Sequence, residues 1–262
     1  MLITGLLQGQ QKVHPLRDPS ALGKPQKGTE FKVQHTLYHR INDTLYASIF
    51  EACNQDYNDF LSYLGDAEYE KYKVDSTQWV QKFVYSYNVP MRIHYNRHEA
   101  FFNYPVVNVS HAGAVKYCEW LTRRYSNRLK DYSLTFRLPT EEEWLLLAHY
   151  NPQTQLPYHL QNGMKDTFYL MNFKPVVNGK NDYPADGGFY TVRVDGYWPD
   201  SCSLFNVIGN VAEMTAIEGV HKGGSWDDIL EDCLVDKKQT YPTPDPRVGF
   251  RVIAIAERRK PQ

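Results

Sequence analysis

The side chains best suited to redox or metal chemistry in this sequence are its four cysteines, Cys53, Cys118, Cys202 and Cys233. No two of them have the C-x-x-C spacing of a structural zinc site, so we do not expect one. Four cysteines in a chain of 262 residues do not make a disulfide scaffold either, and they leave the redox compartment open.

Cys233 has the most informative surroundings of the four. Three acidic residues lie close to it in sequence: Glu231, Asp232 and Asp236. Nearby negative charge raises the pKa of a thiol and disfavours the reactive thiolate. We therefore expect an inert, partly buried thiol at Cys233, and a nucleophilic thiol is the alternative.

Two histidines, His94 and His98, stand four residues apart. On a helix they would share a face and could bind a metal together. No helical pattern surrounds them and no third ligand is identifiable, so we expect surface or packing histidines. The sequence also lacks the nucleophile elbow of hydrolases and the glycine-rich phosphate loop.

The composition is that of a globular chain, with 42% hydrophobic, 23% charged and 14% aromatic residues. A net charge of −1 leaves no surplus of Lys and Arg for phosphate contacts, which argues against nucleic acid as a main partner. No apolar run approaches the roughly 20 residues that span a bilayer, so no transmembrane segment is expected. The apolar residues 1–7 fit a leader remnant, a hydrophobic peg or a frayed end.

One domain over residues 31–262 is expected, preceded by an extended arm or leader remnant at residues 1–30. Short strands or extended segments are predicted at 45–50, 104–109 and 248–253. Between about 150 and 210, Gly, Pro, Asn and Asp recur every few residues, and regular patterns fade. A segment this irregular needs some other support, and bound metal is one physical option.

Hydrophobic spacing predicts three helices, near residues 54–64, 110–125 and 140–149. Asn54 is the expected N-cap of the first helix. Thr140 and Glu143 form a capping box that opens the third, whose apolar side chains predict that it is buried.

Four segments, in this order, resemble the formylglycine-generating-enzyme-like (sulfatase-modifying factor) superfamily. They are YPVVNV at 104–109 leading into AVKYCEW at 114–120, FRLPTEEEW at 136–144, LFNVIGNVAE at 204–213, and KGGSW at 222–226 closed by VGFR at 248–251. The resemblance implies an α+β fold related to C-type lectin domains, loop-rich and low in regular secondary structure.

In the enzymes of this superfamily, two cysteines follow the Gly-Gly-Ser motif and together bind Cu(I). The corresponding positions, counted from Ser225, are Asp228 and Cys233, so the first cysteine is replaced. A carboxylate is a hard ligand and a poor match for Cu(I). Ala212 also stands where the family places an active-site Trp, and Val252 where some members place a disulfide cysteine. The degenerate site of Ser225, Asp228 and Cys233 therefore predicts that copper is not bound.

The resemblance further implies two structural calcium ions. One ligand set would be Asn206, Gly209, Val211 and Glu213, and the other would be Asn172, Phe173, Asp186 and Gly188. Oxygen ligands from carboxylates, amides and backbone carbonyls are those that Ca²⁺ prefers. Glu213 stands in an apolar stretch, where burying a carboxylate without a partner is costly. Turns closed by ordinary hydrogen bonds are the alternative.

Two functional hypotheses follow from the resemblance. Segments 95–107 and 117–122 look most like the Bacteroidota branch that contains gliding-motility and type IX secretion lipoproteins. This similarity implies a non-catalytic binding or assembly protein of a bacterial envelope complex, in the periplasm or at the outer membrane or cell surface, with protein partners. The alternative is a copper-dependent oxidase that converts a substrate cysteine to formylglycine through Cys233.

Overall fold

The computed structural model describes residues 30–157, 160, 164–165, 168–200 and 202–260. The arm expected at residues 1–30 therefore lies outside the described residues, except for Glu30. That residue begins the first strand, in which Phe31 and Val33 are buried.

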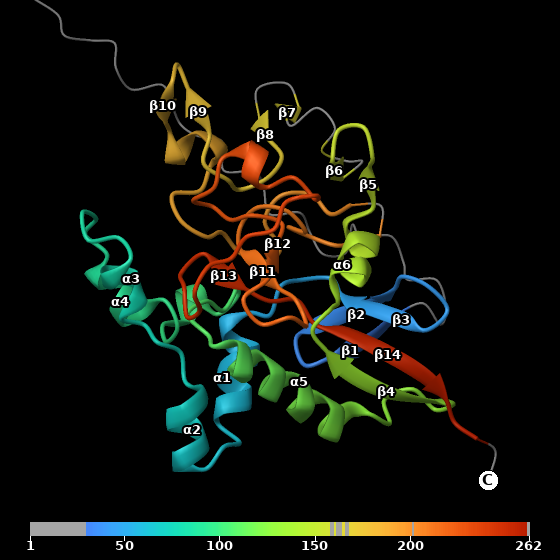
Figure 1. Ribbon diagram of the computed structural model, residues 1–262. Helices are drawn as coiled ribbons and strands as arrows, with labels where there is room; N and C mark the ends of the chain where they lie inside the picture. Colours follow the sequence, from blue (N-terminus) through green and yellow to red (C-terminus); the bar gives the residue numbers. More distant parts are fainter. Residues whose placement is uncertain (1–29, 158–159, 161–163, 166–167, 201, 261–262) are drawn as a thin grey trace, which may run out of the picture.

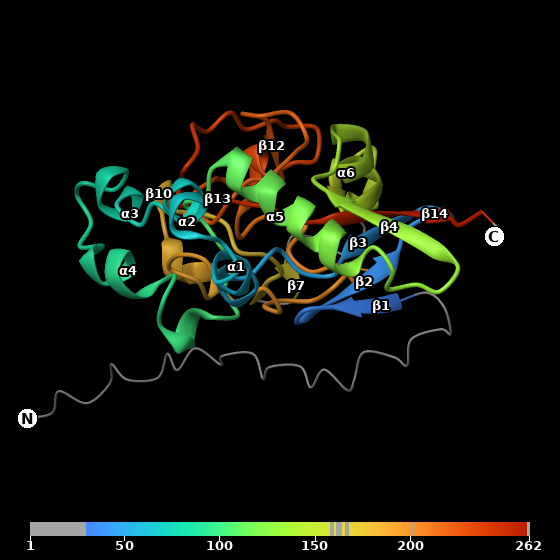
Figure 2. The ribbon, with the colours of Figure 1, turned by 90° about the horizontal axis from the view of Figure 1, so that it is seen from below.

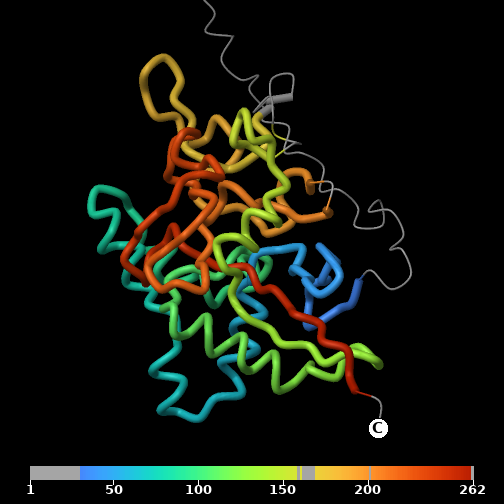
Figure 3. The backbone as a smooth tube through the Cα atoms, turned by 45° about the vertical axis from the view of Figure 1, so that its right-hand side comes forward, coloured from blue at the N-terminus to red at the C-terminus, as the bar shows by residue number. Residues whose placement is uncertain are grey.

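An antiparallel sheet of five strands, in the order β1-β2-β3-β14-β4, is the largest regular element. Its strands are β1 (Glu30–Val33), β2 (Thr36–Arg40), β3 (Leu45–Ser48), β4 (Tyr132–Arg137) and β14 (Ile253–Arg258). The last strand of the chain is thus a central strand, with Ile253 paired to Ala47 on one side and Arg137 on the other. Figure 3 shows this red strand running beside the green β4.

Alternate residues of β14 face two different cores, as the two-residue period of a strand requires. Ala254 and Ala256 belong to a cluster that includes Tyr57 of α1 and Leu121 of α5. Ile253 belongs to a second cluster, built from α6 and the irregular half of the chain. One face of β14 therefore packs toward α1 and α5, and the other packs toward α6 and the irregular half of the chain (Figure 1).

The three predicted helices are confirmed as α1 (Asn54–Leu61), α5 (His111–Tyr125) and α6 (Glu141–Ala148). The Thr140–Glu143 capping box is present with both of its hydrogen bonds. The expected N-cap of α1 is one residue off, because Cys53 takes that position. The side chain of Asn54 instead donates to the carbonyls of Tyr95 and Phe101 and ties the helix to that segment.

Three further helices precede α5: α2 (Asp66–Tyr72), α3 (Gln78–Gln81) and α4 (Val89–His94). They bury few residues, so their sequences carry no apolar stripe. A short helix does end at His94, contrary to the sequence pattern, while the expected surface position of His94 and His98 is confirmed. The turn continues beyond α4 because the His98 amide donates to the His94 carbonyl, and the two exposed rings lie 5.9 Å apart.

The remaining regular structure consists of short pieces, as predicted for the second half of the chain. They are β5 (Tyr150–Asn151), β6 (Leu156–Pro157), β7 (Met164–Lys165), β8 (Phe168–Tyr169), β9 (Val176–Val177), β10 (Lys180–Asn181), β11 (Ala212–Met214), β12 (His221–Lys222) and β13 (Val248–Gly249), with 3₁₀ turns at Glu99–Phe101, Tyr183–Asp186 and Leu230–Asp232.

The closing strand predicted at 248–253 is two strands in two different sheets. β13 pairs with β11 in a three-stranded sheet of order β12-β11-β13, and the chain then crosses to the large sheet as β14. Gly249 allows a close approach, since a Cβ there would lie 2.7 Å from Val211 and 3.0 Å from the Val106 carbonyl. Figure 2, which views the molecule from below, shows α5 in the foreground, β12 toward the top of the view, and β1 and β2 toward the bottom.

Candidate functional site

The Gly-Gly-Ser turn after β12 brings the backbone against the Cys233 thiol. Gly223 and Gly224 both have positive φ, +90° and +66°. A Cβ on Gly224 would lie 2.4 Å from the Cys233 sulfur. Only glycine fits here, for reasons of both conformation and space.

Asp228 is held by three donors, two from Ser225 in this turn and one from Tyr241 in another loop. One carboxylate oxygen accepts from the Ser225 amide at 2.8 Å and from the Ser225 hydroxyl at 2.6 Å. The other oxygen accepts from the Tyr241 hydroxyl. A carboxylate bound in this way closes the turn, and both of its oxygens are engaged in hydrogen bonds.

Cys233 has no exposed surface and lies in the same buried cluster as Trp144 and Val235. Burial holds the pKa of its thiol well above the usual range, and the negative charges of Asp228 and Asp232 raise it further. The expected buried position of Cys233 is confirmed, although the burial is complete rather than partial. None of the four cysteines is in a disulfide. A buried thiol beside an engaged carboxylate does not match the paired soft ligands that Cu(I) takes.

Glu213, on β11, is not the isolated carboxylate that its apolar neighbours suggest. Arg251 donates from Nε to one of its oxygens at 2.9 Å, and Nη2 of Arg251 lies 2.7 Å from the same oxygen in an ion pair. The Trp144 indole donates to the other oxygen at 2.8 Å. None of the Arg251 or Glu213 side chain is exposed. The argument that Glu213 needs a calcium ion as its partner is therefore wrong, because Arg251 supplies the opposite charge.

Asn206, Gly209 and Val211, the other members of the first expected calcium set, each make separate contacts with other residues. The Asn206 amide donates to Glu51 at 3.3 Å and to the Val194 carbonyl at 3.1 Å. The Gly209 amide donates to the Gly223 carbonyl, and Val211 packs in a third cluster with Trp79 and Trp226. The described contacts of these residues are hydrogen bonds and apolar packing.

The second expected set, by contrast, is drawn together around the Asp186 carboxylate. Its oxygens accept from the amides of Phe173 at 2.7 Å and Gly188 at 3.0 Å. A Cβ on Gly188 would lie 2.9 Å from Oδ1 of Asn172, so all four residues adjoin. Burial raises the pKa of Asp186 to about 7 despite these two donors. No positively charged side chain is among the main influences on that carboxyl, so an oxygen-ligated cation fits this site.

Asn210 connects the two sets, and sequence reasoning missed it. Its buried side chain donates to Glu51 at 3.0 Å and accepts from the Asn172 amide at 3.1 Å and the Val192 backbone at 2.8 Å. The only local signal is its place directly after Gly209 in an Ile-Gly-Asn turn, where it adopts a positive φ of 59°. Such a residue predicts a turn. Its hydrogen bonds, however, are made with Asn172 and Glu51, which lie 38 and 159 positions away in the sequence.

Across the described ranges, no three His, Cys, Asp or Glu side chains are grouped so that they could hold a metal ion. A site that relies on amide and carbonyl oxygens, such as the Asn172 set, falls outside that test. None of the helices placed by the structure is long and apolar enough to cross a bilayer.

Sequence and structure comparisons agree with this fold. The family model described as "Sulfatase-modifying factor enzyme 1-like domain" matches residues 38–256, so the chain belongs to this family. The crystal structure of CarF aligns over 81% of this chain and 87% of its own, with a TM-score of 0.51 and 19% identity, which supports the fold alone.

Two curated relatives differ in what their names say about activity. The formylglycine-generating enzyme of Mus musculus is 33% identical over 119 residues, which cover 44% of this chain and 27% of the relative. The inactive C-alpha-formylglycine-generating enzyme 2 of Bos taurus is 28% identical over 180 residues, covering 59% of this chain and 52% of the relative. The alignments thus span between a quarter and about half of the relatives' lengths.

Proposed function

We propose that this chain is a non-catalytic binding or assembly member of the sulfatase-modifying factor family. The observation that carries the proposal is the state of the two copper-ligand positions. Asp228 stands at the first and is held by Ser225 and Tyr241, and Cys233 stands at the second as a fully buried thiol. Neither is free to take Cu(I) as a soft ligand.

The second candidate is an oxidase that acts on a substrate cysteine through Cys233. Cys233 itself and the similarity to the mouse enzyme favour it. Asp228 and the burial of Cys233 oppose it, because a thiolate is costly in an apolar core beside a carboxylate. The two readings differ in a property that can be measured directly, the affinity of the folded protein for Cu(I).

The test is an anaerobic Cu(I) titration of the reduced protein in competition with a chromophoric chelator. We expect no tight one-to-one binding by the native chain, and no conversion of a sulfatase-motif peptide cysteine to an aldehyde in the presence of oxygen. Asp228→Cys is the matched gain-of-function control, because it supplies the thiol missing from the first copper-ligand position, at the required spacing from Cys233. Stoichiometric Cu(I) binding that is lost in Cys233→Ser, or peptide turnover by the native chain, would establish the oxidase instead.

We further propose a place for the protein in a bacterial cell-envelope complex of the gliding or type IX secretion kind, at the periplasmic or outer-membrane surface. The support is the similarity of segments 95–107 and 117–122 to the Bacteroidota branch. Fractionation of the native cells with an antibody to the chain tests it. Recovery with the envelope, cross-linked to envelope proteins, is expected, and recovery in the cytosol alone would contradict it.

Structural calcium is proposed at the Asn172 set. Asp186 and Asn172 would supply side-chain oxygens, and Phe173 and Gly188 would supply backbone carbonyls. The ion would give the buried Asp186 carboxylate the opposite charge that it lacks. We expect Ca²⁺ to raise the melting temperature of chelator-treated protein, because it binds the native state alone. Asp186→Asn should remove that response, and an equal response in this variant would place the ion elsewhere.

The Asn206 set remains a second calcium proposal and is tested in the same way. If Glu213 is a ligand, Glu213→Gln should also abolish the calcium response. If Arg251 alone satisfies this carboxylate, the variant should be less stable and still respond to calcium through Asp186.

A further inference from the structure

Exposed apolar side chains gather on one lobe of the molecule, residues 76–98, which contains α3, α4 and the turn between them. Figures 1 and 2 show this α3–α4 lobe at an edge of the molecule that lies away from the five-stranded sheet. Large apolar side chains exposed on it are Val84, Tyr85, Tyr87, Val89 and Ile93. A group of such side chains within ten residues marks a contact surface for a protein or a membrane.

The turn that carries the two tyrosines is fixed at both ends. Before it, the ring of Phe83 packs against Trp226, with the centroids 5.2 Å apart. After it, the buried side chain of Asn88 donates to the Trp79 carbonyl at 3.2 Å and accepts from the Tyr190 hydroxyl. The exposed residues between these anchors are therefore held in place, and a partner that binds them has little chain to order.

Helix α4 adds its outer face to the same lobe. Met91 and Tyr95, four residues apart, pack inward in the third core cluster. Val89 and Ile93 are also four residues apart, so they share a face, and both are exposed. The helical turn continues beyond α4, and Arg97 follows Ile93 by a further four residues. Apolar and basic side chains thus lie next to each other on this helix.

The lobe is basic although the whole chain has a net charge of −1. Residues 76–98 contain no Asp or Glu, and they contain Lys82, Arg92 and Arg97. The ammonium of Lys82 lies 3.7 Å from the buried Asp245 carboxylate, which offsets part of its charge. Arg92 and Arg97 are exposed, and within the part of the chain that the structure describes neither forms an ion pair. Two positive charges are therefore available to an anionic partner.

This combination fits a lipid surface. Tyrosine has an apolar ring and a polar hydroxyl, and it is enriched where a membrane meets water. Basic side chains beside an apolar face bind the negative headgroups of anionic lipids. The tyrosines of the lobe stand on a turn that projects from the body of the molecule (Figure 1). A fluid bilayer can surround such a turn, whereas a folded protein would need a matching groove.

We propose that the α3–α4 lobe docks on the surface of an anionic lipid bilayer. Tyr85 and Tyr87 enter the headgroup region, and Arg92 and Arg97 lie against the lipid phosphates. The contact is peripheral, made by a turn and one short helix. It goes beyond the proposed function, because it requires neither a metal ion nor a protein partner.

The experiment is sedimentation of the full chain with two kinds of vesicle, one of phosphatidylcholine and one of equal parts phosphatidylcholine and phosphatidylglycerol. We expect saturable binding to the anionic vesicles that weakens as salt is added, because exposed charges are screened. One basic side chain at such a surface changes partitioning about fivefold. Arg92→Gln/Arg97→Gln should therefore weaken this binding roughly tenfold or more. Tyr85→Ser/Tyr87→Ser should weaken it by a similar factor through the lost apolar contact.

Matched controls remove the same kinds of side chain from elsewhere on the surface. Arg123→Gln/Arg258→Gln removes two exposed positive charges outside the lobe, and Leu146→Ser/Ile217→Ser removes two exposed apolar side chains. Neither control should change the affinity for anionic vesicles. Thermal melts of every variant verify that it remains folded.

A fluorescence measurement then locates the contact. Tyr85→Trp places a reporter on the turn of the lobe, and Leu146→Trp places one on α6, which lies on the other side of the molecule in Figure 1. Brominated lipid in the anionic vesicles should quench the fluorescence added at position 85 and leave that added at position 146 unchanged.

Three results would overturn the proposal. The first is equal binding, or none, to the neutral and the anionic vesicles. The second is an unchanged affinity in both lobe variants. The third is binding to soluble polyglutamate that is as tight as binding to vesicles and indifferent to Tyr85→Ser/Tyr87→Ser, which would identify an acidic macromolecule as the partner. Because the assay uses pure lipid and no metal, its failure is distinct from failure of the fractionation, copper or calcium tests.

Discussion

The buried pair of Arg251 and Glu213 provides the sharpest test of the structure. Besides Glu213, Arg251 donates to the carbonyls of Ser48 at 3.0 Å and Phe205 at 2.6 Å. One guanidinium therefore joins the end of β3, the loop at 205 and β11. Glu213→Gln keeps the size of the side chain and its contact with Trp144, but leaves Arg251 as a buried cation whose paired carboxylate is gone.

Removing one partner of a buried ion pair costs about 3–5 kcal/mol, because the remaining charge has lost both water and its counter-charge. Glu51, which also feels the charge of Arg251, offsets part of this cost, so we expect a value near 3 kcal/mol. For a domain of this size, each kcal/mol lowers the melting temperature by about 2–4 °C. A fall of about 6–12 °C should result.

The assay is urea unfolding followed by tryptophan fluorescence, with and without chelator, at constant m-value. Glu213→Gln/Arg251→Met should recover more than half of the lost stability, since replacing a buried pair by apolar groups is often neutral. The reasoning is refuted if the single variant loses less than about 1 kcal/mol, or if chelator brings the native chain to the same stability as the variant. The second result would show that a bound cation, not Arg251, balances Glu213.

The remaining predictions concern pH, thiol reactivity and the glycine turn. The folded pKa of Asp186 is raised to about 7 by burial, so the folded state holds this proton more tightly than the unfolded chain. Its contribution is fully present below about pH 4 and is lost as the pH rises to about 7. Calcium-free protein should therefore lose stability between pH 5 and 8, and Asp186→Asn should lose less, as urea titrations at each pH would show; equal slopes would contradict this. With a thiol reagent, partly exposed Cys202 should react first, and buried Cys53, Cys118 and Cys233 only on unfolding. Early loss of all four thiols in the folded state would contradict their burial. Gly224→Ala should destabilise the fold by about 2 kcal/mol or more in thermal melts, because φ is +66° and the Cys233 sulfur is in the way. A neutral result would show that the turn can shift.

Local signals in the sequence predicted the elements that are held by local interactions. The capping box at Thr140 and the apolar face of α5 each lie within a few residues, and the structure has both. Helices α2, α3 and α4 were missed because they are short and largely exposed, so hydrophobic spacing says little about them. The sequence predicts a strand at 248–253, but the structure has two strands there in two different sheets. Nothing local in the sequence marks the crossing at residues 250–252.

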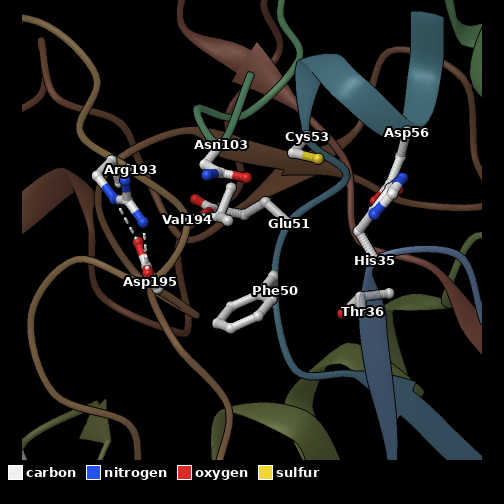
Figure 4. A pocket seen from close by; sticks show the side chains of 10 residues that line it. All are labelled: His35, Thr36, Phe50, Glu51, Cys53, Asp56, Asn103, Arg193, Val194 and Asp195. Atoms are coloured by element: carbon white, nitrogen blue, oxygen red, sulfur yellow. Dashed lines mark hydrogen bonds and ion pairs between the residues drawn. The ribbon is translucent and has the colours of Figure 1, made fainter. Parts of the chain in front are cut away.

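Contacts between side chains far apart in the sequence could not be predicted from it. Glu213 was interpreted as a carboxylate without a counter-charge because its partner, Arg251, lies 38 residues away. Asp228 follows Ser225 by three residues, so this contact is local, but its third donor, Tyr241, comes from another loop. The pocket lined by His35, Asp56 and Arg193 (Figure 4) is assembled from the β1–β2 hairpin, α1 and the loop at 193–195, so no single stretch of sequence predicts it.

The central position of β14 sets a condition on the order of assembly. Strands β3 and β4 are neighbours only through β14, which bonds to both. A chain emerging from the ribosome at about 5–20 residues per second can form the β1–β2–β3 meander and the α5–β4 unit early, but cannot join them until residues 253–258 are available. Completion of this sheet therefore waits until residues 253–258 are available, and a nascent or truncated chain that lacks them would expose two unpaired strand edges. Those edges are the surfaces through which such incomplete chains would aggregate.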